Sequence, residues 1–188
     1  MTDLPTPSAP RLAVLGTGVM GETVLAGALA SGWRPDDVVA TVRRPERADE
    51  LAARHGVRTT RDNVEAGRGA GVGVVAGAPK DVGALLAEVH DAVGEGTVVV
   101  SVVVGLPTAF YEERLPAGTA VVRVMPNTPS VVGAGVSAVS GGSAADDDDV
   151  ALGERLLTST GRGGRGAARA PAGGSGRSGG GAAARGAA

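Results

Sequence analysis

The sequence contains no cysteine, so it can form neither a disulfide nor a metal site built from thiolates. Its two histidines, His55 and His90, are too few for a typical zinc site, and we expect them to lie as polar residues on helix surfaces. Aromatic residues make up only 2% of the chain, whereas hydrophobic residues make up 43%, so the core must consist of Val, Leu and Ala. These absences exclude a disulfide scaffold and predict a protein without a bound metal.

A strong charge of either sign is also missing, because 18 basic and 20 acidic residues leave a net charge of −2. This balance gives no electrostatic reason to expect nucleic acid or an anionic membrane as a partner. No apolar run approaches the roughly 20 residues of a membrane-spanning helix. Residues 1–10 lack the basic start and apolar stretch of a secretory signal. We therefore expect a cytoplasmic protein whose first ten residues form a disordered arm.

Short apolar runs and amphipathic stretches alternate from residue 11 to about residue 162. The strongest helix signal places Val82, Leu85, Leu86, Val89 and Val93 on one helix face. Further helices are expected after the first strand, with Gly32 as a stop signal, and over residues 46–54, with Gly56 just past the end. We expect strands at residues 11–15, 37–42, 57–59, 72–76, 97–104 and 120–125, with a hairpin partner at 136–139. The alternation predicts an α/β fold with a doubly wound, mostly parallel sheet.

Four consecutive aspartates at residues 146–149 precede the last amphipathic stretch. Such a cluster could hold a metal ion, but acidic residues also favour the positive end of a helix dipole. We interpret the aspartates as the N-terminus of a helix that carries Val150, Leu152, Leu156 and Leu157, with Gly161 as its C-cap.

The composition changes abruptly after residue 162. Residues 163–188 contain only Gly, Ala, Arg, Ser and Pro, so nothing in this segment offsets an ordering cost of about 1–2 kcal/mol per residue. We predict a disordered, low-complexity tail. Two origins stay open: a natural flexible tail, or a GC-rich gene read in the wrong frame, since all five residue types have GC-rich codons.

A glycine-rich turn follows the first apolar run. Gly16, Gly18 and Gly21 have the GxGxxG spacing of a dinucleotide-binding turn, and they stand between a strand and a helix, where a Rossmann-type fold places them. In that fold the first glycine permits the tight turn, the second lets the backbone approach a pyrophosphate, and the third allows close helix packing. We expect Gly16, Thr17, Gly18, Val19, Met20 and Gly21 to bind the cofactor. The alternative is a glycine turn without a ligand.

The end of the second strand bears on the choice of cofactor. An enzyme that uses NAD would place an acid there for the ribose 2′-hydroxyl, whereas this chain has Arg43 and Arg44. A guanidinium can hold a 2′-phosphate with paired, charge-assisted hydrogen bonds, and an acid would repel it. We therefore predict NADP, as NADPH, with NAD still possible. The alternative is that one or both arginines are solvated surface charges.

A third landmark is the Val-Met-Pro-Asn-Thr-Pro run at residues 124–129, directly after a strand. Pro126 and Pro129 stiffen this segment, and Asn127 supplies a donor and an acceptor. In a doubly wound sheet the segment would lie at the carboxyl ends of the strands, where ligands bind. A purely structural turn fits the spacing equally well.

Three segments resemble pyrroline-5-carboxylate reductase: GTGVMG, RRPERA at residues 43–48, and above all VRVMPNTPSVVGAGVSAVS at residues 122–140. The resemblance covers residues 11 to about 162. It implies a Rossmann domain that binds NAD(P)H and reduces 1-pyrroline-5-carboxylate to L-proline in proline biosynthesis. It also implies that the residues matching Met125, Pro126 and Asn127 lie near the nicotinamide.

The chain departs from the family at several points. Where the family has Ala-Val-Lys-Pro touching the cofactor, this chain has Ala76, Gly77, Ala78 and Pro79, so the lysine is absent at its position. The family continues into a helical domain that forms the dimer and binds the substrate carboxylate through Ser-Gly-Ser-Gly-Pro. No such motif occurs here, and the tail stands where that domain should begin. We therefore expect a truncated reductase without assignable catalytic residues. The alternatives are an inert NADP-binding domain and another small oxidoreductase, such as a coenzyme F420-dependent NADP reductase.

Overall fold

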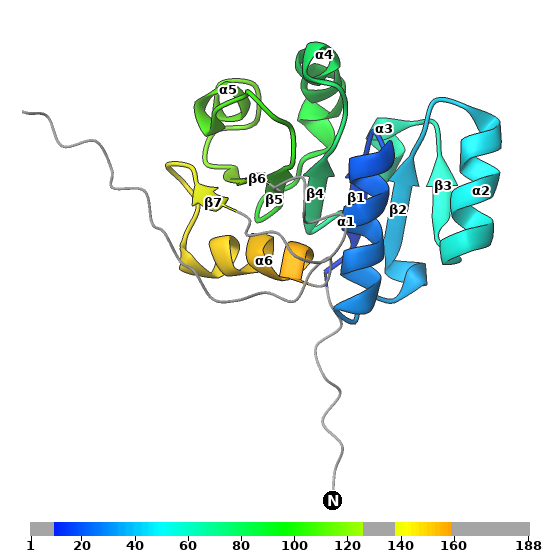
Figure 1. Ribbon diagram of the computed structural model, residues 1–188. Coiled ribbons are helices and arrows are strands. Elements are labelled where there is room, and N and C mark those ends of the chain that lie inside the picture. The colour runs from blue at the N-terminus through cyan, green and yellow to red at the C-terminus, as the bar shows by residue number, and fades with distance from the viewer. Residues whose placement is uncertain (1–9, 126–137, 159–188) are drawn as a thin grey trace, which may run out of the picture.

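The computed structural model describes residues 10–125 and 138–158, in which strands and helices alternate as the sequence predicts (Figure 1). The strands are β1 (Leu12–Leu15), β2 (Val38–Thr41), β3 (Arg58–Thr60), β4 (Val72–Val75), β5 (Val98–Ser101), β6 (Ala120–Met125) and β7 (Ala138–Gly141). The helices are α1 (Val19–Ala30), α2 (Pro45–His55), α3 (Asn63–Gly67), α4 (Pro79–Val89), α5 (Thr108–Glu112) and α6 (Asp147–Thr158). Two short 3₁₀ helices, η1 (Pro35–Asp37) and η2 (His90–Ala92), complete the described elements.

All seven described strands form one sheet in the order β3-β2-β1-β4-β5-β6-β7. Every neighbouring pair is parallel except β6 and β7, which form the antiparallel edge. The chain moves outward from β1 to β3 and then crosses back to β4, which pairs with the other side of β1. The doubly wound fold is therefore confirmed, with its topological switch point between β1 and β4. At such a point the connections diverge and leave a crevice at the carboxyl ends of the strands.

The alternation of side chains along the strands builds a hydrophobic core on each face of the sheet. Leu12 and Val14 of β1 point to the face covered by α1 and α6, and Ala13 and Leu15 point to the opposite face. This two-residue period places the Val-rich strands under helices on both sides (Figure 1). The core on the first face also contains Trp33, whose indole N–H donates to the Pro10 carbonyl at 2.9 Å.

The strand expected over residues 97–104 is shorter in the structure, because β5 ends at Ser101. The buried Ser101 hydroxyl donates to the Tyr111 hydroxyl at 2.6 Å and accepts the Val103 N–H at 3.2 Å. The Val103 N–H thus bonds to a side chain of its own segment and not to a neighbouring strand. Val104, the next residue, is 65% exposed. The expected hairpin partner is present as β7, which ends two residues beyond the predicted end.

The helix ends follow the local signals in the sequence. Gly56 caps α2 in the left-handed conformation with φ of 69°, and Gly32 follows α1 with φ of 104°. The carboxylate of Asp146 accepts the N–H groups of Asp148 and Asp149, both at 2.9 Å, and that of Asp149 accepts the Asp146 N–H at 3.1 Å. These bonds form a reciprocal cap, so the interpretation of the aspartates as a helix N-terminus is confirmed.

The expectation that both histidines lie on helix surfaces is wrong for His55. Its side chain is only 14% exposed, and its Nε2 lies 2.9 Å from the carboxylate of Glu22 on α1. Arg47 and Arg54 of α2 pair with the same carboxylate. Burial raises the pKa of Glu22, but the hydrogen bonds from His55, Arg47 and Arg54 outweigh it and lower the pKa to about 2. His90 is half exposed beside Asp91.

Among the described residues, no helix is long and apolar enough to cross a membrane, and no group of three acidic or histidine side chains is arranged to hold a metal ion. The predicted disordered segments, residues 1–10 and 163–188, lie outside the described residues except for Pro10. Gly161, the expected cap of the last helix, also lies outside them.

Candidate cofactor site

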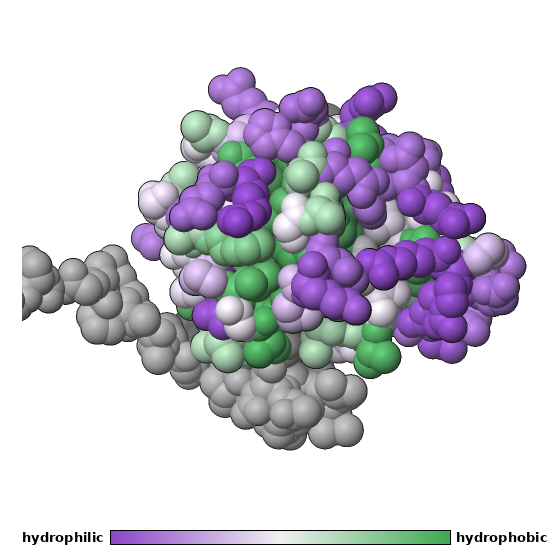
Figure 2. All heavy atoms as spheres, turned by 90° about the horizontal axis from the view of Figure 1, so that it is seen from above, coloured by the Kyte–Doolittle hydropathy of each residue, from purple (hydrophilic) through white to green (hydrophobic). Residues whose placement is uncertain are grey.

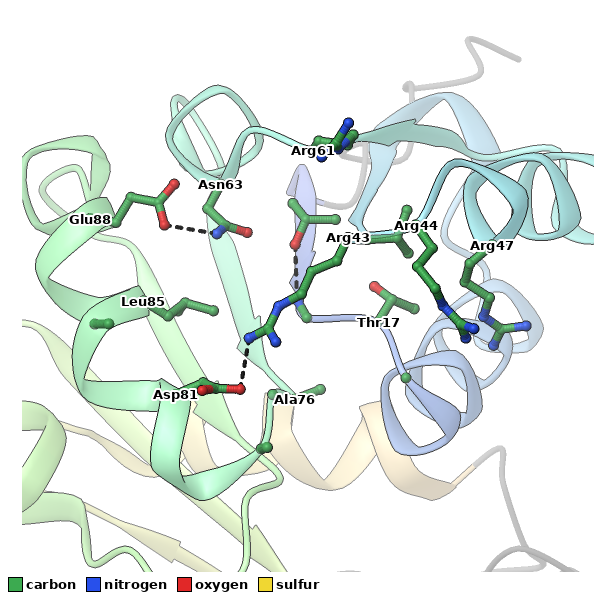
Figure 3. Close-up of a pocket in the computed structure, with 17 residues that line it drawn as sticks. Thr17, Arg43, Arg44, Arg47, Arg61, Asn63, Ala76, Asp81, Leu85 and Glu88 are labelled. Carbon is green, nitrogen blue, oxygen red and sulfur yellow. Dashed lines mark hydrogen bonds and ion pairs between the residues drawn. The ribbon is translucent and has the colours of Figure 1, made fainter.

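A cavity of about 460 Å³ lies at the switch point, where the loops after β1, β2 and β4 meet (Figure 3). Its position is the crevice that a doubly wound sheet offers to ligands. It is lined by Gly16, Thr17, Gly18, Thr41, Val42, Arg43, Arg44, Arg47, Arg61, Asn63, Ala76, Gly77, Ala78, Asp81, Ala84, Leu85 and Glu88.

The first glycine of the turn makes a sharp corner after β1. Gly16 has φ of 77°, and a Cβ on it would lie 3.0 Å from the Gly77 Cα, so only glycine fits without strain. Thr41 of β2 holds the turn: its Oγ1 accepts the Gly16 N–H at 2.9 Å, and its carbonyl accepts the Thr17 N–H at 2.8 Å. The Thr17 hydroxyl donates to the Val14 carbonyl at 3.1 Å. The turn is thus fixed by bonds to both neighbouring strands.

The other two glycines have different surroundings. A Cβ on Gly18 would meet nothing within 4 Å, and Gly18 lines the cavity. A Cβ on Gly21 would lie 3.2 Å from the Ala76 Cβ and 3.4 Å from a Val14 methyl, so this glycine lets α1 pack closely on the sheet. Helix α1 begins at Val19, and the N–H groups of its first turn lack partners within the helix. Open space beside a helix N-terminus fits a pyrophosphate.

Several arginines surround the part of the cavity next to β2 and α2. Arg43 extends across the cavity to Asp81 of α4, with its Nη2 2.7 Å from the carboxylate, whereas Arg44 and Arg47 do not reach toward α4 (Figure 3). Arg47 is held by Glu22 and Glu50, and Arg44 makes no ion pair among the described residues. Seen onto the carboxyl ends of the strands, hydrophilic side chains gather on the side of α2 and β3 (Figure 2). This end of the cavity suits an anionic group.

Helix α4 forms the opposite wall. Asp81, Ala84, Leu85 and Glu88 recur at helical spacing and line the cavity, while Val82, Leu86 and Val89 are buried in the core. Glu88 accepts the amide of Asn63 from α3 at 3.0 Å. The wall therefore has an apolar middle and an acidic group at each end.

The structure brings together half of the predicted cofactor residues. Gly16, Thr17, Gly18, Arg43, Arg44, Ala76 and Ala78 line the cavity. Val19, Met20, Gly21 and Pro79 are not among the lining residues. Met125 ends β6, is 40% exposed and is not among the lining residues, whereas Pro126 and Asn127 lie outside the described residues. The role of all these residues in binding stays a prediction.

Among the lining residues that the sequence did not indicate are Arg47, Arg61, Asn63, Asp81 and Glu88. The helical spacing of Asp81, Ala84, Leu85 and Glu88 was a usable signal, because it marks a second stripe beside the core stripe of α4. For Asn63 there was no such signal, because α3 has only five residues.

The strand order and the glycine turn at the switch point define a dinucleotide-binding protein of the Rossmann type. A family model described as "NADP oxidoreductase coenzyme F420-dependent" matches residues 11–105, just over half of the chain. The chain belongs to that family.

Its relatives carry a more specific name. A pyrroline-5-carboxylate reductase of Mycobacterium tuberculosis is 40% identical over 138 residues, which cover 70% of this chain and 46% of the relative. One from Corynebacterium melassecola is 36% identical over 153 residues, which cover 80% of this chain and 57% of the relative. The resemblance found in the sequence is thereby confirmed, and the chain spans about half the length of these relatives.

Solved structures agree on the fold. A pyrroline-5-carboxylate reductase of Coxiella burnetii superimposes with a TM-score of 0.76 at 31% identity, over 81% of this chain and 57% of that chain. A pyrroline carboxylate reductase of Plasmodium falciparum, solved with NADP bound, gives 0.69 at 22% identity, over 82% and 56%. The second likeness concerns the fold alone.

Proposed function

We propose that this chain supplies the NADPH-binding part of a pyrroline-5-carboxylate reductase. The observation that carries the proposal is the cavity at the switch point, with its glycine turn on one side and its arginines on the other. The substrate class rests on the names of the relatives at 36–40% identity. Because the chain spans about half of their length, the reaction of the whole protein is itself part of the proposal.

Different groups of residues are assigned to the different parts of the cofactor. The open face of Gly18 and the N-terminus of α1 receive the pyrophosphate. Ala84 and Leu85 offer an apolar wall for the adenine, and Arg43 and Arg44 hold the 2′-phosphate that distinguishes NADPH from NADH. On the nicotinamide side we retain Ala76, Ala78 and Pro79, together with Met125, Pro126 and Asn127.

Bound NADPH supplies a hydride, which together with a proton saturates the ring C=N bond of 1-pyrroline-5-carboxylate and yields L-proline and NADP⁺. The task of this chain is to fix the nicotinamide in position, because a held reactant lowers the entropic part of the barrier. The glycine turn is suited to this task since bonds to β1 and β2 hold it rigid.

Calorimetric titrations of the purified chain with NADPH and with NADH test the cofactor assignment. Arg44→Ala removes a guanidinium that has no competing ion pair among the described residues, so NADPH binding should weaken about tenfold while NADH binding stays unchanged. Arg34→Ala is the matched control, because Arg34 is exposed beside Asp36 and does not line the cavity. Equal affinities of the unaltered chain for NADPH and NADH would refute the preference for NADP.

Turnover tests the substrate assignment. The chain is mixed with NADPH and 1-pyrroline-5-carboxylate, and L-proline is measured by mass spectrometry. Proline formation supports the reductase and excludes an inert domain, whereas tight NADPH binding without proline supports the bare cofactor domain for this chain.

The family description favours a second candidate, a reductase that transfers a hydride between coenzyme F420 and NADP. The same assay with reduced coenzyme F420 and NADP⁺ separates the two, because only this candidate produces NADPH absorbance without pyrroline-5-carboxylate.

A further inference from the structure

The ion pair between Arg43 and Asp81 crosses the cavity. Arg43 follows β2 and Asp81 stands in the first turn of α4, 38 residues further along the chain, yet the guanidinium lies 2.7 Å from the carboxylate. Arg43 is 82% exposed and Asp81 is 32% exposed, so the pair spans open space instead of being packed in the protein (Figure 3). The attraction between the two charges, and not the packing of neighbouring side chains, therefore holds Arg43 against Asp81.

The two acidic residues that line the cavity have different partners. Glu88 accepts the amide of Asn63, a neutral group, whereas Asp81 holds one of the arginines that face the ligand. A carboxylate and a phosphate seek the same N–H donors of a guanidinium. A 2′-phosphate that binds Arg43 must therefore displace Asp81 or share the guanidinium with it. A 2′-hydroxyl meets no such competition, because it carries no charge.

We propose that Asp81 is a specificity-determining residue that competes with the 2′-phosphate for Arg43. This inference rests on the assignment of Arg43 to the 2′-phosphate in the proposed function. In the free protein Asp81 occupies the guanidinium, and it thereby weakens the binding of 2′-phosphorylated nucleotides while nucleotides with a free 2′-hydroxyl are unaffected. The chain consequently discriminates between NADPH and NADH less strongly than its arginines alone would allow.

Equilibrium binding of 2′,5′-ADP and of 5′-AMP tests the competition without any turnover. Asp81→Asn keeps the shape of the side chain and removes its charge. Because exposed ion pairs are weak, we expect 2′,5′-ADP to bind about two- to fivefold more tightly and 5′-AMP to bind unchanged. Asp36→Asn serves as the matched control, since Asp36 pairs with Arg34 on the surface and does not line the cavity.

A second background distinguishes competition from simple repulsion. When Arg43→Ala is already present, Asp81→Asn should no longer change the affinity for 2′,5′-ADP, because the guanidinium that Asp81 holds is absent. An equal gain in that background means that Asp81 only repels the phosphate, which overturns the inference. Weaker binding after Asp81→Asn means that Asp81 positions Arg43 for the ligand, and this also overturns it. A chain that binds no 2′,5′-ADP overturns the inference as well.

The outcome is separate from that of the proposed function. A chain that binds 2′,5′-ADP in the expected Asp81-dependent way but forms no proline refutes its reductase activity alone. A chain that forms proline but responds equally to both nucleotides after Asp81→Asn refutes the competition alone. Circular dichroism of each variant checks that the fold is intact.

Discussion

Glu22 of α1 bonds to Arg47, Arg54 and His55 of α2, and Glu22→Gln tests how much this cluster contributes to stability. The substitution keeps the size of the side chain and removes the charge that pairs with Arg47 and Arg54. Arg47 and His55 are only 19% and 14% exposed, so water compensates poorly for the lost carboxylate. We expect the variant to fold and to be less stable.

The pKa of Glu22 sets the size of the effect. A fall from 4.5 to about 2 corresponds to about 3 kcal/mol of unfolding free energy at about 1.36 kcal/mol for each pKa unit. Arg54 is 58% exposed, so part of the interaction is screened, and we expect a loss of about 2 kcal/mol at pH 7. Because the pKa of the folded protein is the lower one, this stabilisation is complete above pH 4.5 and is lost as the pH falls through about 2.

Urea unfolding followed by circular dichroism, at pH values from 7 down to 2.5, measures the free energy of unfolding of both chains. The two curves should lie about 2 kcal/mol apart at pH 7 and converge below pH 4.5. Glu113→Gln is the control, because Glu113 is 72% exposed beside Arg114 and should cost less than about 0.5 kcal/mol. Parallel curves for the Glu22 variant and the unaltered chain over the whole range would contradict the reasoning.

Three further substitutions probe the turn and the core. Gly16→Ala should lower the free energy of unfolding by about 1–2 kcal/mol in urea titrations, because it forces φ of 77° on a residue with a Cβ; an unchanged midpoint would disprove the strain. Gly18→Ala should leave stability nearly unchanged but weaken NADPH binding in calorimetry, since its methyl group enters the open cradle, and undiminished affinity would argue against a pyrophosphate there. Tyr111→Phe should cost about 1 kcal/mol by removing the buried bond with Ser101, and in a Ser101→Ala background the cost should shrink, an interaction that a double-mutant cycle measures.

The sequence predicted the fold well because strand and helix periodicities are local properties. The Val-rich runs predict strands, and the apolar stripe of α4 predicts a helix, each from local sequence alone. The alternation of strands and helices then leaves few possible topologies. The glycine turn was predictable for the same reason, since all three of its glycines lie within six residues of the chain.

The opposite wall of the cavity was harder to predict. Asp81 and Glu88 look like solvated charges on a helix, and only the position of α4 opposite the loop after β2 makes them cavity residues. The same holds for Thr41, which looks like an ordinary strand residue but accepts the N–H of Gly16. Such roles depend on which distant segments meet, and no local pattern encodes that.

Trp33 gives the protein an optical reporter of its own. It is the only tryptophan in the sequence, it is 6% exposed, and its indole N–H is bonded to the carbonyl of Pro10, immediately before β1. Its fluorescence therefore arises from one known place, near the start of β1, whereas the candidate cofactor cavity lies at the carboxyl ends of the strands. A red shift of the emission will signal the opening of the core under α1, and a ligand that leaves the spectrum in place will have bound without loosening that core.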